Sequence, residues 1–258
     1  MRVDIYLTEN GYAQSRQRAK VLIESGCVSV DGKRIEKPST QIEGDHHAVE
    51  VRDTLRYVGR GGLKLEAALD AFSIDVHNLC ALDIGASTGG FTDCLLQRGA
   101  RAVCAVDAGE GQLAAKLLED GRVTSLEHTN ARTLTLEQIG GNRVDLIVMD
   151  VSFISATYIL PRFPELLTPD GQAVCLIKPQ FEVGRSMLGK GGIVKDKQAH
   201  RFAVDRVIDA GRALGLLPKG LIVSPIEGGD GNREFLVYFV RAESDGGITP
   251  DAIRRVTG

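Results

Sequence analysis

The chain has 258 residues, of which 43% are hydrophobic and 25% charged, and its net charge is −3. This composition is ordinary for a globular protein, and the length allows a full α/β domain plus a small module. No apolar run approaches the roughly 20 residues of a membrane span, and the first ten residues show no signal-peptide pattern. The five cysteines are scattered, and His46-His47 lacks partners at ligand spacing. We therefore expect a reduced cytoplasmic protein that uses neither a metal nor a membrane.

The first 52 residues predict a small α+β module. Residues 1–64, which include it, have a net charge of +2, whereas the remainder of the chain has −5. Apolar positions indicate a short helix around Tyr6 and a second helix over 16–25, for which Ser15 is a good N-cap. The run 28–35, with Asp-Gly at its centre, predicts a hairpin. Ile42 and the segment 49–51 are expected to supply later strands.

The segment 15–39 reads SRxxAxxLIxxGxVxVDGKxxxKPS and resembles the small RNA-binding module of the ribosomal-protein-S-four type. Taken one by one, its Lys and Arg residues are explained as well by a solvated surface. As a set within that pattern they imply RNA binding through phosphate contacts, which weakens with salt. The RNA-binding residues expected in this module are Arg2, Ser15, Arg16, Arg18, Lys20, Lys33 and Arg34.

The segment 53–62, DTLRYVGRGG, is the expected boundary between this module and the rest of the chain. It contributes Arg60 as a further RNA-binding candidate. A helix is predicted over 63–72, with Lys64 in its first turn, where the helix dipole disfavours a cation. Lys64 is therefore either an ordinary exposed lysine or one held at a site.

The stretch 79–99, LCALDIGASTGGFTDCLLQRG, predicts a strand, a tight glycine turn and a helix, the opening unit of a doubly wound sheet. Asp107 ends the next strand, 102–106, at 22 residues past Gly85, where this architecture binds a ribose diol. The glycines do not spell G-x-G-x-x-G, and Asp83 before the turn suits a cationic ligand. A purely structural turn is the alternative.

The pattern Asp-x-Gly-x-x-x-Gly-Gly resembles the first motif of S-adenosylmethionine-dependent methyltransferases, whose ligand carries an amine and a sulfonium. The cofactor-binding residues that this resemblance implies are Asp83, Gly85, Ala86, Ser87, Thr88, Gly89, Phe91, Asp107, Ala108, Asn130, Ala131 and Asp150.

The remaining elements alternate between helices and strands, with no internal repeat. We expect helices over 112–119, 154–167 and 196–214, and strands over 126–129, 144–149, 173–177, 220–223 and 234–241. The Gly-rich segment 179–195 is long enough to be a lid, and it supplies Arg185 and Lys190 as RNA-binding candidates. The tail from Ser244 is expected to be loosely held.

Charged residues follow several predicted strands. Because ligands bind outside the carboxyl ends of parallel strands, Asp150 and Lys178 are expected at one rim. If the last strand runs antiparallel, Glu234 begins at the same rim, and Lys64 can reach it from the helix before the first strand. Two lysines and two carboxylates would then lie beside the cofactor turn.

Five motifs in order, YVGRGGLKLE, DIGASTGGFTD, VMDVSFIS, LIKPQFE and GNREFLVY, resemble the TlyA (haemolysin-like) family of ribosomal RNA 2′-O-methyltransferases, whose catalytic domain is FtsJ-like. The resemblance implies an α/β fold, with a small α+β RNA-binding domain at 1–52, a linker at 53–62 and a Rossmann-like methyltransferase domain at 63–258. It also implies S-adenosyl-L-methionine as cofactor and ribosomal RNA or a ribosomal subunit as partner. Gly59 departs from the pattern, which has Ser there.

The same resemblance places a catalytic tetrad on Lys64, Asp150, Lys178 and Glu234. Lys178 would bind the ribose 2′-oxygen and take its proton, while the carboxylates hold the two lysines. The chain starts directly at the RNA-binding module, as in the shorter subtype, which acts on a cytidine of large-subunit rRNA. We expect a monomer.

Four other functions are weighed against this one. Gly85-x-Ser87-x-Gly89 also fits a hydrolase nucleophile elbow, with Asp150 and His200 as partners, although no oxyanion segment precedes it. A dinucleotide oxidoreductase would need the full glycine fingerprint. A haemolysin-like, membrane-active protein would need a span or a cationic amphipathic helix. A non-catalytic RNA-binding ribosome-assembly factor would need only the N-terminal module.

Overall fold

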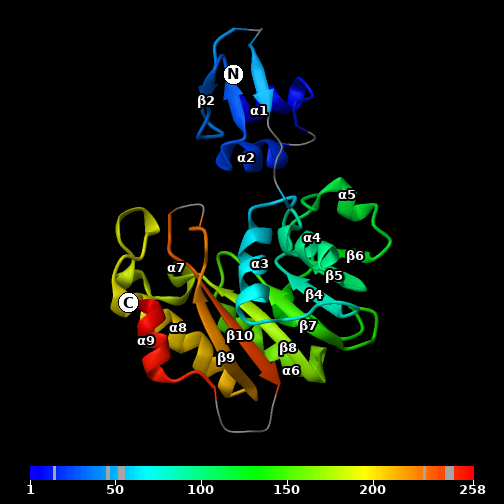
Figure 1. Cartoon of the computed structure of the whole chain (residues 1–258), viewed down its shortest axis with the longest axis vertical. Coiled ribbons are helices and arrows are strands. Elements are labelled where there is room, and N and C mark those ends of the chain that lie inside the picture. Colours follow the sequence, from blue (N-terminus) through cyan, green and yellow to red (C-terminus); the bar gives the residue numbers. More distant parts are fainter. Residues whose placement is uncertain (14–15, 45–46, 52–55, 229–230, 242–246) are drawn as a thin grey trace.

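The fold is described from a computed structural model, which describes residues 1–13, 16–44, 47–51, 56–228, 231–241 and 247–258. A small N-terminal part and a larger C-terminal part can be followed in Figure 1. The small part contains α1 (Val3–Glu9), α2 (Arg16–Glu24) and the antiparallel sheet β2-β1-β3, formed by Lys33–Arg34, Val28–Val30 and Val49–Val51. Its core is apolar and includes Val3, Leu7 and Leu22.

The predicted hairpin is confirmed, because Ser29 pairs with Arg34 across the Asp31-Gly32 turn. One detail of the prediction is wrong. Ile42 lies in the apolar core rather than in a strand. His47, for which the sequence predicts a solvated turn together with His46, has its Nδ1 2.7 Å from Asp31 Oδ2 and its ring edge-on against Tyr6, whereas His46 lies outside the described residues.

The larger part is built on a seven-stranded sheet in the order β6-β5-β4-β7-β8-β10-β9. Strands β4 (Cys80–Ile84), β5 (Ala102–Val106), β6 (Val123–Leu126), β7 (Val144–Met149) and β8 (Leu167–Ile177) are parallel neighbours. Strand β10 (Phe235–Arg241) runs antiparallel to both β8 and β9 (Leu216–Val223), as predicted. The start of β10 therefore lies at the rim formed by the carboxyl ends of the parallel strands.

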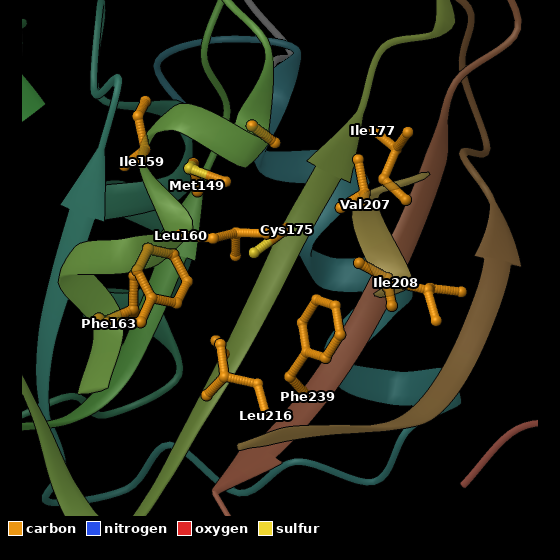
Figure 2. Close-up of a cluster of buried hydrophobic side chains, with 14 of the residues drawn as sticks. Met149, Ile159, Leu160, Phe163, Cys175, Ile177, Val207, Ile208, Leu216 and Phe239 are labelled. Atoms are coloured by element: carbon orange, nitrogen blue, oxygen red, sulfur yellow. The ribbon is translucent and has the colours of Figure 1, made fainter. Parts of the chain in front are cut away.

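The central strands are buried on both faces, and alternate residues enter two separate cores. In β7, Leu146 and Val148 pack with α3 (Gly61–Ala71) and α4 (Gly90–Gln97), whereas Ile147 and Met149 face α8 (Lys197–Arg212). Figure 2 shows this second core, to which Phe163, Cys175, Val207 and Phe239 contribute buried side chains from separate elements. This two-sided burial explains why β7 reads as a continuous apolar run.

Three predicted elements are shorter or shifted in the structure. The helix expected over 112–119 is only α5 (Ala115–Leu118), and Gln112 instead accepts a hydrogen bond from Ser87 Oγ. The strand expected over 126–129 lies earlier, as β6 (Val123–Leu126). It ends at Leu126 because the Thr129 N–H turns back to donate to the Asp107 carbonyl. The helix expected over 154–167 is two 3₁₀ turns and α6 (Phe163–Leu166), since its prolines lack the N–H that a helix interior needs.

Two C-terminal segments are more ordered than expected. The predicted lid begins with α7 (Pro179–Glu182) and continues through two 3₁₀ turns. Of the tail, residues 242–246 lie outside the described part, but α9 (Pro250–Thr257) is a helix that packs on α8 and β9. Its Ile253 is 2% exposed and belongs to the core beneath α8. Within the described residues, no helix combines the length and apolarity that crossing a membrane requires.

Removing the buried side chain of α9 tests this docking. We expect Ile253→Ala to lower the free energy of unfolding by about 2 kcal/mol, through lost burial and a residual cavity. The measurement is urea unfolding followed by circular dichroism. The exposed Arg255→Ala on the same helix is the control. Equal unfolding midpoints for both variants would show that α9 does not contribute to the core.

Candidate active site at the carboxyl rim of the sheet

The glycine turn after β4 is shaped by its neighbours on both sides. Gly85 has φ +83°, its N–H donates to the Val106 carbonyl, and an added Cβ would lie 2.3 Å from the Asp150 backbone oxygen. Only glycine fits a left-handed position in such close contact with another strand. The turn is thereby held between the ends of β5 and β7 and leaves its backbone open toward the rim.

Two adjoining cavities of 190 and 550 Å³ lie over this turn and share Gly85, Ser87, Asp150 and Ser152. The smaller cavity reaches Lys178, and the larger one reaches Asp107. The predicted cofactor residues that line these cavities are Gly85, Ala86, Ser87, Thr88, Phe91, Asp107, Ala108, Asn130, Ala131 and Asp150. Asp83 and Gly89 line neither cavity; Gly89 instead faces Leu113 and Leu117.

Asp107 ties the turn to the next loop. Its Oδ2 accepts from the Ser87 N–H and its Oδ1 from the Gly109 N–H, both at 2.8 Å. Each carboxylate oxygen keeps a second lone pair, so the group can still accept bonds from hydroxyls in the larger cavity. Asn130, opposite, caps a 3₁₀ turn by accepting from the Arg132 N–H.

Asp83 is a buried acid with one unpartnered oxygen. Its Oδ2 accepts from Thr92 Oγ1 at 2.6 Å, whereas its Oδ1 is buried without a partner among the described residues. Burial raises the pKa of Asp83 to about 7 from its ordinary value of 3.8, and the nearby Asp150 contributes in the same direction. A cationic group in the cavity would favour the ionised form of this acid.

The four charged residues of the predicted tetrad form two ion pairs. Lys64 Nζ lies 2.5 Å from Glu234 Oε2, and both side chains are nearly excluded from solvent. Lys178 Nζ lies 2.6 Å from Asp150 Oδ1 and donates to Ser152 Oγ at 2.7 Å. Asp150 Oδ1 receives no aligned hydrogen bond, so this second pair is held by charge rather than by a directed bond.

The two pairs also influence each other. Burial raises the pKa of Glu234, while Lys64 and, more weakly, Lys178 lower it. Lys64 reaches this site from the first turn of α3 with its side chain 9% exposed, so it is the lysine held at a site rather than an ordinary exposed one. The inner pair is buried, whereas Lys178 and Asp150 line the cavity.

The loop after Asp150 contains residues that the sequence analysis did not single out. Phe153 is 91% exposed in a left-handed conformation, and its ring lies 5.3 Å from that of Phe181. The far side of the loop is fixed by the buried Glu182, which accepts from Ser155 Oγ and from the Ala156 N–H. An exposed Phe beside the cavity was visible in the sequence only as part of the motif VSFIS.

The linker contacts both parts of the chain. The Val58 N–H donates to Asp93 Oδ2, which also pairs with Lys116, while the Val58 carbonyl accepts from Arg18. The departure at Gly59 has a local reason, because a Cβ there would lie 2.6 Å from Thr88 Oγ1. A serine at this position would require the Thr88 side chain to move.

The predicted RNA-binding residues lie in several separate regions. Arg2 and Arg16 both pair with the buried Asp4, and Lys33 and Arg34 are exposed in β2. Lys20 lines the larger cavity from the side of α2. Arg60 precedes α3, whereas Arg185 and Lys190 are exposed beyond α7. Ser15 lies outside the described residues.

The hydrolase alternative is not supported by the geometry. Ser87 Oγ donates to Gln112, whereas His200 Nε2 pairs with the Val194 carbonyl. The two side chains thus have different partners, and no Ser–His pair forms. Among the described residues, no group of three or more His, Cys, Asp or Glu is placed to hold a metal ion.

Comparison with known proteins agrees with this architecture. The profile of the FtsJ-like methyltransferases matches residues 57–241, and that of the S4 domain matches residues 1–47. The fold and the site therefore define a methyltransferase of the FtsJ-like class that bears an S4 domain, and the predicted α/β fold class is confirmed.

Individual relatives narrow the class to a family. The "16S/23S rRNA (cytidine-2'-O)-methyltransferase TlyA" of Mycobacterium tuberculosis is 45% identical over 98% of this chain and 96% of its own length. The "23S rRNA (cytidine-2'-O)-methyltransferase TlyA" of Campylobacter jejuni is 32% identical over 93% and 100%. A solved Streptococcus thermophilus structure that carries a hemolysin name has a TM-score of 0.80 at 41% identity, covering 100% of this chain and 94% of that one. The chain belongs to the TlyA family.

The buried acid gives a pH-dependent prediction. Because the folded state holds the Asp83 proton more tightly than the unfolded state, the free energy of unfolding should fall as pH rises from about 4 to about 7. The size is on the order of 1 kcal/mol per pKa unit. We expect Asp83→Asn to lose this dependence and to be more stable than wild type at pH 8. Urea unfolding across pH, with the exposed Asp75→Asn as control, measures it. If the free energies of unfolding of wild type and Asp83→Asn changed with pH in parallel, the raised pKa of Asp83 would be contradicted.

Proposed function

We propose that the chain transfers a methyl group from S-adenosyl-L-methionine to the ribose 2′-hydroxyl of a cytidine in ribosomal RNA. The observation that carries this proposal is the Lys178–Asp150 pair beside two adjoining cavities: Lys178 lines the smaller one, Asp107 lines the larger one, and Asp150 lines both. The matches to FtsJ-like and S4 profiles, and the names of the TlyA relatives, support the same reaction.

The residues present fit the cofactor. Asp107 offers free acceptor lone pairs for a ribose diol, and the open backbone of the Gly85 turn accommodates close approach. The unpartnered oxygen of Asp83, just behind the turn, favours a cationic ligand. S-adenosylmethionine supplies an electrophilic methyl group on its sulfonium.

Lys178 carries the main role toward the RNA. Its Nζ orients the 2′-oxygen and, by taking the hydroxyl proton, relieves the negative charge that would develop on that oxygen. By holding the 2′-oxygen in line with the methyl group that the cofactor would supply, Lys178 would contribute much of the rate through placement. Asp150 and Ser152 fix the position of Lys178. The buried Lys64–Glu234 pair adds a further charge interaction, between the Glu234 carboxylate and Lys178.

The RNA would contact the protein at two places. The S4 module supplies exposed cations for phosphates, and Phe153 at the cavity rim offers a ring face on which an unstacked base can pack. We propose large-subunit rRNA as the substrate. The relative at 45% identity is named for both subunits, so 30S and 50S particles should be assayed together.

A non-catalytic assembly factor would need the S4 module but not two ion pairs beside a cofactor-sized cavity. A haemolysin-like activity is supported only by relatives' names.

We further propose that the protein acts in the cytoplasm as a monomer. Light scattering of the purified chain tests the latter.

Substitution of Lys178 separates charge from proton transfer. We expect Lys178→Ala to lower methyl transfer by about 100-fold or more, with cofactor affinity retained. Lys178→Arg should fall nearly as far, because arginine keeps the charge but cannot take a proton. Transfer from radiolabelled S-adenosylmethionine to 50S particles measures both, with the exposed Lys219→Ala as control. Substantial activity in the arginine variant would restrict Lys178 to a purely electrostatic role.

Neutralising the hairpin cations tests RNA docking. We expect the double change Lys33→Ala and Arg34→Ala to weaken rRNA binding and to reduce its dependence on salt, because phosphate contacts release counterions. Filter binding at several salt concentrations measures this, and cofactor affinity should be unchanged. A salt slope equal to that of wild type would place the RNA on another surface.

A further inference from the structure

Asn232 lies two residues before Glu234 and uses its side chain entirely within the protein. It is 1% exposed, its Oδ1 accepts from the Val194 N–H at 2.9 Å, and its Nδ2 donates to the Gly192 carbonyl at 3.3 Å. Both ends of one buried amide therefore hold the same short segment. Removing it would leave a buried donor and an acceptor without partners, which is costly.

The segment held by Asn232 is a compact basic loop, residues 189–194. The Gly189 N–H donates to the Ile193 carbonyl, and Gly191 and Gly192 have positive φ, so the loop reverses tightly with Lys190 exposed. A second anchor comes from His200, whose Nε2 pairs with the Val194 carbonyl. The loop is thus fixed at its base while its charged side chain remains outside.

The backbone of Asn232 also lies close to the active site. The Asn232 carbonyl accepts from the Gly228 N–H, and an added Cβ at Gly228 would lie 2.6 Å from Glu234 Oε1. On the other side, the His200 ring packs edge-on against Phe235, the residue after Glu234. In Figure 1, loop 189–194 and the segment that leads into β10 lie side by side above α8. Asn232 thus bonds loop 189–194 through its side chain and Gly228, which lies close to the Glu234 carboxylate, through its backbone carbonyl.

We propose that Asn232 is a positioning residue that couples the basic loop 189–194 to Glu234, because its side chain holds the loop while its backbone, two residues before Glu234, holds Gly228 beside that carboxylate. This inference rests on the proposed function for its substrate. It differs from that function in predicting that two sites on separate loops do not behave independently. The partner recognised by the loop is the phosphate backbone of the RNA.

A double-mutant cycle on RNA affinity tests the coupling without requiring activity. Lys190→Ala should weaken binding of a 23S rRNA fragment about threefold to tenfold in the wild-type background, as expected for loss of one phosphate contact. In the Asn232→Ala background the same change should have almost no further effect. Asn142→Ala, an exposed Asn at the opposite end of the sheet, is the matched control background. Additive effects of Lys190→Ala in both backgrounds would overturn the proposal.

Steady-state kinetics of the same variants tests whether Asn232 also affects Glu234. We expect Asn232→Ala to lower kcat about tenfold at saturating cofactor, because a small displacement of Glu234 and the lysine it holds slows a reaction that depends on placement. Lys190→Ala should instead raise KM for RNA. Asn232→Asp retains the acceptor for Val194 but loses the donor to the Gly192 carbonyl, and it serves where the alanine variant fails to fold; it should reduce the Lys190 effect. An unchanged kcat in a folded Asn232 variant would contradict coupling to Glu234. Absence of transfer by wild type would refute the proposed function, and the binding cycle would still decide the coupling.

Discussion

The buried ion pair between Lys64 and Glu234 is the constraint on which the rim of the sheet depends. Two charges taken out of water are tolerated only when each is paired, and losing one partner leaves the other uncompensated. The pair joins the first turn of α3 to the start of β10, 170 positions apart in the chain. It therefore requires β10 to run antiparallel beside β8, which in turn places Lys178 and Asp150 next to it.

The glycine turn connects this charged cluster with the linker. A Cβ on Gly90 would lie 2.9 Å from the Gly62 N–H, and one on Gly61 would lie 3.9 Å from Asp150 Oδ2. The start of α3 therefore packs directly over the start of α4, and the linker before it is held by Asp93. Because the Val58 carbonyl also accepts from Arg18, the S4 module is joined to the same backbone that borders the cofactor turn.

The central strands could be predicted because burial on both faces leaves an unmistakable apolar run; β5 and β7 begin and end where the pattern predicts. Strand-end reasoning also brought Lys64, Asp150, Lys178 and Glu234 to one rim. What could not be predicted depends on distant partners. The apolar side of α9 is buried only because α8 packs against it. Strand β6 is shifted because the Thr129 N–H donates to the Asp107 carbonyl. The hydrogen bond between Asn232 and Val194 joins residues 38 positions apart. Local spacing carries no record of such contacts.

The role of Lys178 is tested most directly by a structure of the protein with S-adenosylhomocysteine and an rRNA fragment that contains the acceptor cytidine. We expect the acceptor 2′-oxygen within about 3 Å of Lys178 Nζ, at hydrogen-bond distance. We also expect that Glu234 still pairs with Lys64 and that the ribose of the ligand lies against Asp107. An acceptor oxygen well beyond hydrogen-bond distance of Lys178, in a complex whose RNA is otherwise ordered at the rim, would contradict the central claim.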